Sequence, residues 1–128
     1  MATRTSAEVR QSADQMAQMH QWTGLLNGDD GSWVTVMGFT DLTAIASNTF
    51  GVGGSVAIEG TMILTGTPAA SEIFACRSPS ETVIALVSAS PSRQVLEGPF
   101  RIRPRVTAGD GTTNLTVTIR AKASARVA

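Results

Sequence analysis

The side chains in this sequence that could carry out catalysis are few. His20 is the only histidine, and Cys76 is the only cysteine. Neither a Ser-His-Asp nor a Cys-His set can be assembled without His20. We expect His20 to lie exposed on a short helix and Cys76 to be a small buried apolar residue, which also excludes an internal disulfide. The sequence therefore predicts that the protein is not an enzyme and has no catalytic residues.

The sequence signals for metal and cofactor sites are equally weak. Asp29 and Asp30 precede a glycine, which is typical of a turn. The pair also resembles the start of a calcium loop, but the twelfth position from Asp29 is Thr40 instead of the required glutamate. The run Gly51-Val-Gly-Gly54 fits neither a dinucleotide-binding fingerprint nor a phosphate loop. We expect no metal and no cofactor.

Basic residues are the third group that could do chemistry, by binding anions. Two segments, 100–107 and 113–122, alternate apolar and polar residues and predict two strands around a tight turn. Arginine dominates the basic residues, since Lys122 is the only lysine. Guanidinium groups make forked contacts with carboxylates. We predict that one wet face of these strands is an interface formed by Arg101, Arg103, Arg105, Arg120 and Lys122.

The two strands are expected to pair as a hairpin. Their apolar residues share a face only if paired positions sum to an odd number. A four-residue loop would place Val106 opposite Leu115, and a two-residue loop would place it opposite Thr113. Pro104 lacks an amide hydrogen, so its strand is either an edge strand or is paired only locally on one side.

Three arginines at alternate positions of one strand, about 7 Å apart, repel one another unless acidic groups lie between them. The expected hairpin partner offers no acid. Carboxylates must then come from another strand, with Glu59 and Glu97 as candidates, or from another chain. The alternative is a solvated strand face whose charges keep a sheet edge soluble.

Composition and pattern predict one β-rich domain. The 128 residues carry no net charge, which gives no long-range attraction to nucleic acid. No apolar run approaches the length of a membrane span, and the first residues lack a signal-peptide core, so we expect no membrane partner and synthesis in a cytoplasm. Residues 1–21 are expected to form a short helical or extended arm, and a helix there could start from a capping box at Thr5 and Glu8.

Residues 22–128 are expected to form a single domain of many short strands, an antiparallel β-sandwich or a Greek-key or jelly-roll-like barrel. Trp33 to Phe39 alternates, with Trp33 and Phe39 as core residues. Residues 41–47 suit either a helix or a strand. The other strands are expected at 55–64, 72–76, 81–89 and 94–97, and 81–89 is apolar on both faces, like a central strand.

Three segments resemble a family of small virion proteins of tailed phages: Trp22–Gly28, Ser47–Gly60 and Arg101–Arg120. In that family a glycine-rich turn leads into a strand ending in Glu-Gly, and a later arginine-proline strand leads into a Gly-Asp-Gly-Thr-Thr turn. Here Thr61-Met-Ile-Leu-Thr65 is expected to prolong the strand, where relatives turn.

The resemblance implies a capsid decoration or cement protein that docks on the major capsid protein at the virion surface, as a homotrimer by analogy. Arg103→Glu would then leave the monomer folded and weaken attachment. The alternatives are a tail or head-fibre base protein and a carbohydrate-binding module. Such modules usually present exposed aromatic platforms, and a glycan array with no binding would remove this alternative.

Overall fold

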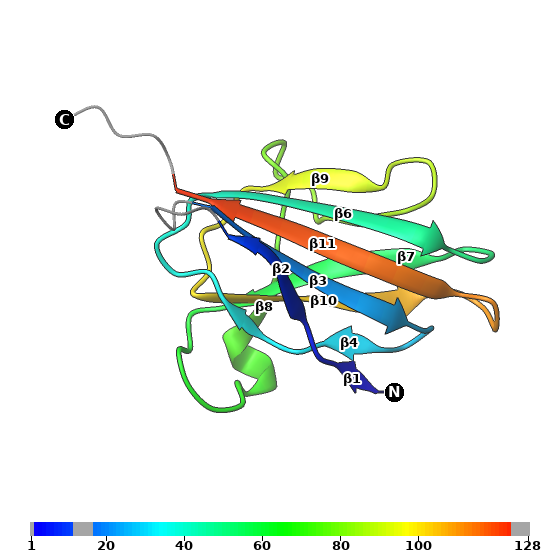
Figure 1. The fold of residues 1–128 in the computed structure, drawn as a ribbon, viewed down its shortest axis with the longest axis horizontal. Helices are drawn as coiled ribbons and strands as arrows, with labels where there is room; N and C mark the ends of the chain where they lie inside the picture. The colour runs from blue at the N-terminus through cyan, green and yellow to red at the C-terminus, as the bar shows by residue number, and fades with distance from the viewer. Residues whose placement is uncertain (1, 12–16, 124–128) are drawn as a thin grey trace.

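The computed structural model places the chain in two β-sheets packed face to face, which confirms the all-β sandwich (Figure 1). It describes residues 2–11 and 17–123. Sheet A has the order β1 (Thr3–Arg4), β4 (Asp30–Gly31), β10 (Arg101–Ala108), β7 (Ser55–Thr61) and β8 (Ile73–Ala75), and β5 (Val34–Thr35) also pairs with β10. Sheet B has the order β2 (Ala7–Gln11), β3 (Ala17–Leu25), β11 (Asn114–Lys122), β6 (Asp41–Thr49) and β9 (Ser92–Val95).

The remaining regular element of the described residues is a single turn of 3-10 helix, η1 (Ala70–Glu72). Across the ranges given above, no helix is long and apolar enough to cross a membrane. The core lies between the two sheets, where every second strand residue points inward. Its largest fully buried side chains include Trp22, Leu25, Leu42, Ile58, Leu86, Ile102, Leu115 and Ile119.

The predicted hairpin between residues 100–107 and 113–122 is wrong. β10 belongs to sheet A and pairs with β7, whereas β11 belongs to sheet B and pairs with β3 and β6. Val106 lies opposite Val56, and Leu115 lies opposite Leu25 and Asn48. Both apolar faces still point into the core, but they meet across it from opposite sheets. The connection 109–113 is thus an arch between sheets.

Pro104 shows how one strand accommodates a residue with no amide hydrogen. On one side β10 pairs with β7 along its length, with Pro104 opposite Ile58. On the other side it pairs only in two short stretches, with β5 at Arg101 and Ile102 and with β4 at Arg105, on either side of Arg103 and Pro104. The predicted local pairing is confirmed, since the gap falls where proline cannot donate.

Of the helical or extended arm expected at residues 1–21, the helical form is wrong and the extended form is confirmed in the described residues. β1 pairs in parallel with β4 in sheet A, and after Thr5 and Ser6 the chain enters sheet B, where β2 pairs with β3. β3 runs across the boundary expected at residue 21, and residues 12–16 of the expected helix lie outside the described part. The expected helix had only a narrow apolar stripe, and a short helix of this kind is marginal in water. Pairing with the exposed edges of the two sheets therefore outweighed the helix propensity of these residues.

The middle of the chain departs from the predictions in two places. β7 ends at Thr61 instead of continuing to residue 64, and Met62 and Leu64 are exposed. Residues 81–89 form no strand. Their backbone pairs only through isolated bridges such as Val56↔Leu86, although Ile84 and Leu86 are buried in the core. Glu81 has a positive φ of 64°, which breaks an extended chain. Residues 41–49 are a strand, which resolves the helix-or-strand ambiguity.

Candidate interaction surface

The five predicted interface residues do not share one face. Arg101, Arg103 and Arg105 lie on the outer face of sheet A, because the residues that alternate with them, Ile102, Pro104 and Val106, are buried. Arg120 and Lys122 are exposed on the outer face of sheet B. The single basic face expected from the hairpin is therefore wrong, since an arch places the two strands on opposite sides of the sandwich.

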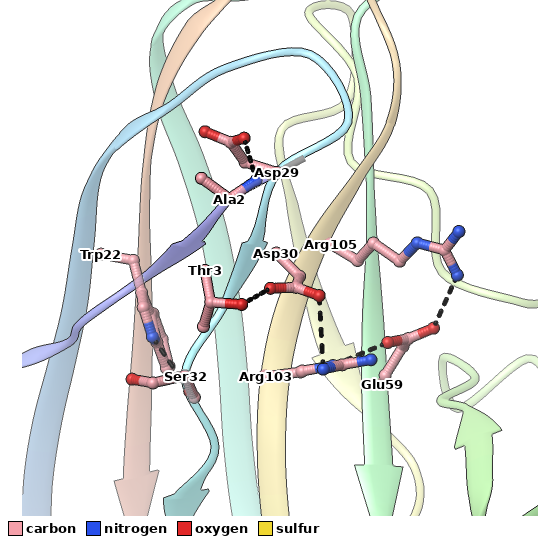
Figure 2. A network of polar contacts seen from close by, with 9 residues as sticks. All are labelled: Ala2, Thr3, Trp22, Asp29, Asp30, Ser32, Glu59, Arg103 and Arg105. Carbon is pink, nitrogen blue, oxygen red and sulfur yellow. Dashed lines mark hydrogen bonds and ion pairs between the residues drawn. The ribbon is translucent and has the colours of Figure 1, made fainter. Parts of the chain in front are cut away.

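Arg103 has its carboxylate partners within its own chain (Figure 2). Its Nε lies 2.9 Å from Oε1 of Glu59, the residue directly opposite on β7, and its Nη1 lies 3.4 Å from Oδ2 of Asp30 on β4. The three side chains are only 17%, 13% and 7% exposed. Arg103 is thus a largely buried cation that joins three neighbouring strands of sheet A.

The neighbouring arginines are also held from within. Arg105 places Nη1 3.5 Å from Oε2 of Glu59. Arg101 donates from Nε and Nη2 to the carbonyl oxygens of Ile63 and Gly66, at 2.7 and 2.8 Å. The expectation that Glu59 would supply a charge between the arginines is confirmed. Glu97, the other candidate, binds the main chain and the guanidinium of Arg77 instead.

Trp33 covers this group from outside. Its ring centroid lies 4.5 Å from Cζ of Arg103 and 5.9 Å from that of Arg101, distances typical of cation–π contacts. Trp33 is half-buried and does not belong to the core, contrary to the prediction. Trp22 is fully buried, with its Nε1 donating to the carbonyl oxygen of Ser32 at 3.1 Å. Neither tryptophan forms an exposed aromatic platform.

Asp29 and Asp30 hold the N-terminal strand onto sheet A (Figure 2). Oδ1 of Asp29 accepts from the amide of Ala2 at 2.9 Å, and its Oδ2 lies 3.2 Å from Nε of Arg4. Oδ1 of Asp30 accepts from the hydroxyl of Thr3 at 2.6 Å. Because Asp30 also contacts Arg103, the N-terminal strand and the arginine network share one carboxylate.

The pKa of Asp29 lies below its ordinary value. Burial of the carboxyl acts to raise it, but hydrogen bonds from the amides of Leu26 and Ala2, together with Arg4, outweigh that effect. The charged form is therefore the one that the turn accommodates. The sequence identified the turn but not this role, because an Asp-Asp-Gly turn has the same pattern whether its side chains face solvent or a neighbouring strand.

Asp110 joins the two arches between the sheets. Its Oδ2 accepts from the amide of Val52 in the β6–β7 connection at 2.9 Å, and its Oδ1 accepts from the amide and hydroxyl of Thr112. Thr113 adds a hydrogen bond to the carbonyl oxygen of Phe50 at 2.8 Å. Figure 1 shows both arches at the same end of the sandwich. This carboxylate therefore links two turns that are about 60 residues apart in the sequence. Holding them together costs the chain entropy of closing a loop of that length, and the hydrogen bonds offset part of this cost.

We expect Asp110→Asn to be destabilising at neutral pH, with a deficit that disappears in acid. The hydrogen bonds of Thr112 and Val52 lower the pKa of Asp110 from 3.8 to about 2. A lowered folded-state pKa stabilises the protein above the unfolded value, and this stabilisation is lost as the pH falls from about 4 to about 2. Urea unfolding of the variant and the parent across this range measures the difference. Asp41→Asn is the control, and a pH-independent difference for Asp110→Asn would contradict the assignment.

The two residues first considered for catalysis are both buried. His20 lies in β3 with Nε2 3.1 Å from Oε1 of Gln18, not exposed on a helix as expected. Cys76 is fully buried, as predicted, and burial raises the pKa of its thiol to about 12, with the charges of Glu97 and Glu59 adding to the effect. Within residues 2–11 and 17–123, no group of three His, Cys, Asp or Glu side chains is placed to hold a metal.

The outer face of sheet B differs from that of sheet A. Arg120 and Lys122 stand at one end of β11 and form no ion pair with a described residue. Ile45 is 45% exposed at the middle of β6. The rest of this face on β6 and β11 is mostly hydroxyl-bearing, and we call it the hydroxyl face: Thr43, Ser47, Thr49, Thr116 and Thr118, with Ile45, Arg120 and Lys122.

Comparison of the chain with protein-family models, with curated proteins and with solved structures found no match.

Proposed function

We propose that this chain is a structural protein of a tailed-phage virion, a decoration or cement protein that docks on the major capsid protein at the particle surface. Its role is mechanical, so no reaction or cofactor is involved. The proposal starts from the resemblance of Trp22–Gly28, Ser47–Gly60 and Arg101–Arg120 to such proteins.

The positions of these three segments support the proposal. Ser47–Gly60 contains the first arch and most of β7, and Arg101–Arg120 contains β10, the second arch and most of β11. Asp110 joins the two arches, and Leu25, in the segment Trp22–Gly28, pairs with Leu115. Residues shared with the family therefore form one continuous part of the sandwich, a rigid block of the kind that a surface protein needs.

We infer the position of the docking surface from a contrast between the outer faces of the two sheets. The arginines of sheet A are occupied by Glu59, Asp30 and main-chain carbonyls, so they have little left to offer a partner. The hydroxyl face carries the cations Arg120 and Lys122 without ion pairs among the described residues. Neutral hydroxyls cost less to desolvate than charges, and Ile45 adds exposed apolar surface.

Each contact on such a face is weak. An exposed ion pair contributes about 0–1 kcal/mol. Firm attachment would then come from many copies. A trimer docked at three equivalent points binds more tightly than one subunit, because the first contact raises the effective concentration for the other two. The mass of the purified protein in solution tests the trimer directly.

The test uses capsids of the encoding phage prepared without this protein, to which the purified protein is added back. We expect Arg120→Gln to reduce the number of copies bound per capsid and to leave the melting temperature of the protein unchanged. Arg105→Gln is the matched control, since it removes the same charge from an exposed arginine on the opposite face. The double variant Arg120→Glu, Lys122→Glu should bind still less. Equal occupancy of all variants would contradict docking through the hydroxyl face, and the native protein located on the tail would favour the fibre or tail role instead.

A further inference from the structure

A pocket of about 280 Å³ opens below the edge of sheet B, between β9 and the loop that follows β8. Its polar lining consists of Ser78, Ser80, Thr82 and Arg93. Val83 and Ala85 form an apolar wall beside them, and Val83 is 56% exposed. No carboxylate is among the residues that line it.

The loop geometry aligns the three hydroxyls. The amide of Ser78 donates to the carbonyl oxygen of Thr82 at 2.8 Å, and the amide of Glu81 donates to that of Ser78 at 2.7 Å. The turn closes because Glu81 adopts a positive φ of 64°, which is costly for a residue with a side chain. This brings the Ser78 and Ser80 hydroxyl oxygens to 2.8 Å.

Thr82 adds a third hydroxyl beside this pair. Ser78 and Ser80 share one hydrogen bond in which either can be the donor, and the Ser80 hydroxyl oxygen lies 3.5 Å from Oγ1 of Thr82, which is longer than an ordinary hydrogen bond between hydroxyls. The Thr82 hydroxyl is therefore able to donate to another group, such as the oxygen of an anion.

Arg93 supplies a charge at the same opening. It pairs with the buried Ala44, so its side chain leaves β9 on the core side of the sheet and not on the hydroxyl face. Its Nη1 donates to the carbonyl oxygen of Ser92 at 2.9 Å, and it forms no ion pair with a described residue. The remaining guanidinium donors are free to bind an oxyanion.

We propose that this pocket binds a carboxylate group on a short aliphatic stem. The fork of Arg93 matches the two oxygens of a carboxylate, the Thr82 hydroxyl supplies a further donor, and Val83 and Ala85 contact the stem. The volume suits a small group instead of a whole drug-sized ligand. The carboxylate could belong to a free small acid or to a glutamate side chain of a protein partner. The site is independent of the virion role.

The test is a nuclear magnetic resonance titration of the whole chain at neutral pH. Sodium propionate represents the free acid, and a capped peptide with one glutamate represents the protein source. Sodium chloride at equal ionic strength and the same peptide with glutamine are the controls. We expect saturable shifts confined to residues 78–85 and 92–94, and Arg93→Gln should weaken binding about tenfold or more.

Arg105→Gln is the matched control variant and should bind like the parent. Thr82→Val should weaken binding less than Arg93→Gln, because it removes a neutral donor. Saturation by propionate assigns the pocket to free acids, and tighter binding of the glutamate peptide assigns it to a partner. Shifts that do not saturate, or that persist unchanged in Arg93→Gln with its fold intact, overturn the proposal.

Discussion

Replacing Arg103 with methionine is expected to lower the free energy of unfolding by about 3–5 kcal/mol. The substitution removes the cation that lies between Glu59 and Asp30, whose side chains are 13% and 7% exposed. Two nearly buried carboxylates would then face each other, with only the longer contact of Glu59 to the exposed Arg105 left to offset their charges. The cation–π contact between Arg103 and the ring of Trp33 would also be lost. Chemical denaturation at neutral pH measures the loss.

Arg105→Met is the matched control for this experiment. Arg105 reaches the same Glu59 but is 49% exposed, and its contact is longer at 3.5 Å. We expect its replacement to cost no more than about 1 kcal/mol. Similar losses for the two variants would show that Arg103 is not the structural cation that the geometry indicates. This expectation replaces the earlier one that an acidic residue at position 103 would leave the fold intact.

Gly31→Ala is expected to destabilise the protein by about 1–3 kcal/mol, as overpacking of a core does. A Cβ at this position would lie 2.7 Å from Cδ of Pro104 and 2.7 Å from the ring of Trp22. Neither ring is the flexible end of a long side chain, so backbone must move. Gly31 is also the residue opposite Arg4, so the N-terminal strand should loosen with it. Equilibrium unfolding and amide exchange at residues 2–4 measure the two effects.

Gly98→Ala is the control for Gly31→Ala. A Cβ at Gly98 would meet nothing within 4 Å, and its φ is not in the left-handed region. Its substitution should be neutral or slightly stabilising, since alanine restricts the unfolded chain. If the two alanine variants were equally stable, the tight contact between β4, Pro104 and Trp22 would not constrain the fold.

In β10 and β11, the alternation of residues was sufficient to predict which side chains are buried. Ile102, Val106, Leu115, Val117 and Ile119 all point into the core as expected. Alternation follows from the two-residue repeat of an extended chain, which is a local property. The same local property excluded a helical fold for most of the chain, whereas Cys76 was recognisable as a core residue because a free cysteine usually behaves as a small buried apolar residue.

Only some of the carboxylate partners of the β10 arginines could be predicted, because local sequence does not show which strands lie side by side. Repulsion between neighbouring arginines required a carboxylate on an adjacent strand, and Glu59 met that requirement. Asp30 did not stand out, because nothing in a turn sequence says which strand lies above it. The role of Asp110 was missed in the same way, since its partner Val52 belongs to another arch.

By itself, the sequence determined an all-β chain, the inward and outward side of its main strands, and the need for acids among the arginines. Only the tertiary structure decided that β10 and β11 belong to different sheets, and that the N-terminal residues pair along the sheet edges as strands. The physical reason is that alternation sets the face of a residue but not its neighbour. A hairpin and an arch bury the same side chains, and the choice between them depends on contacts with strands far away in the chain.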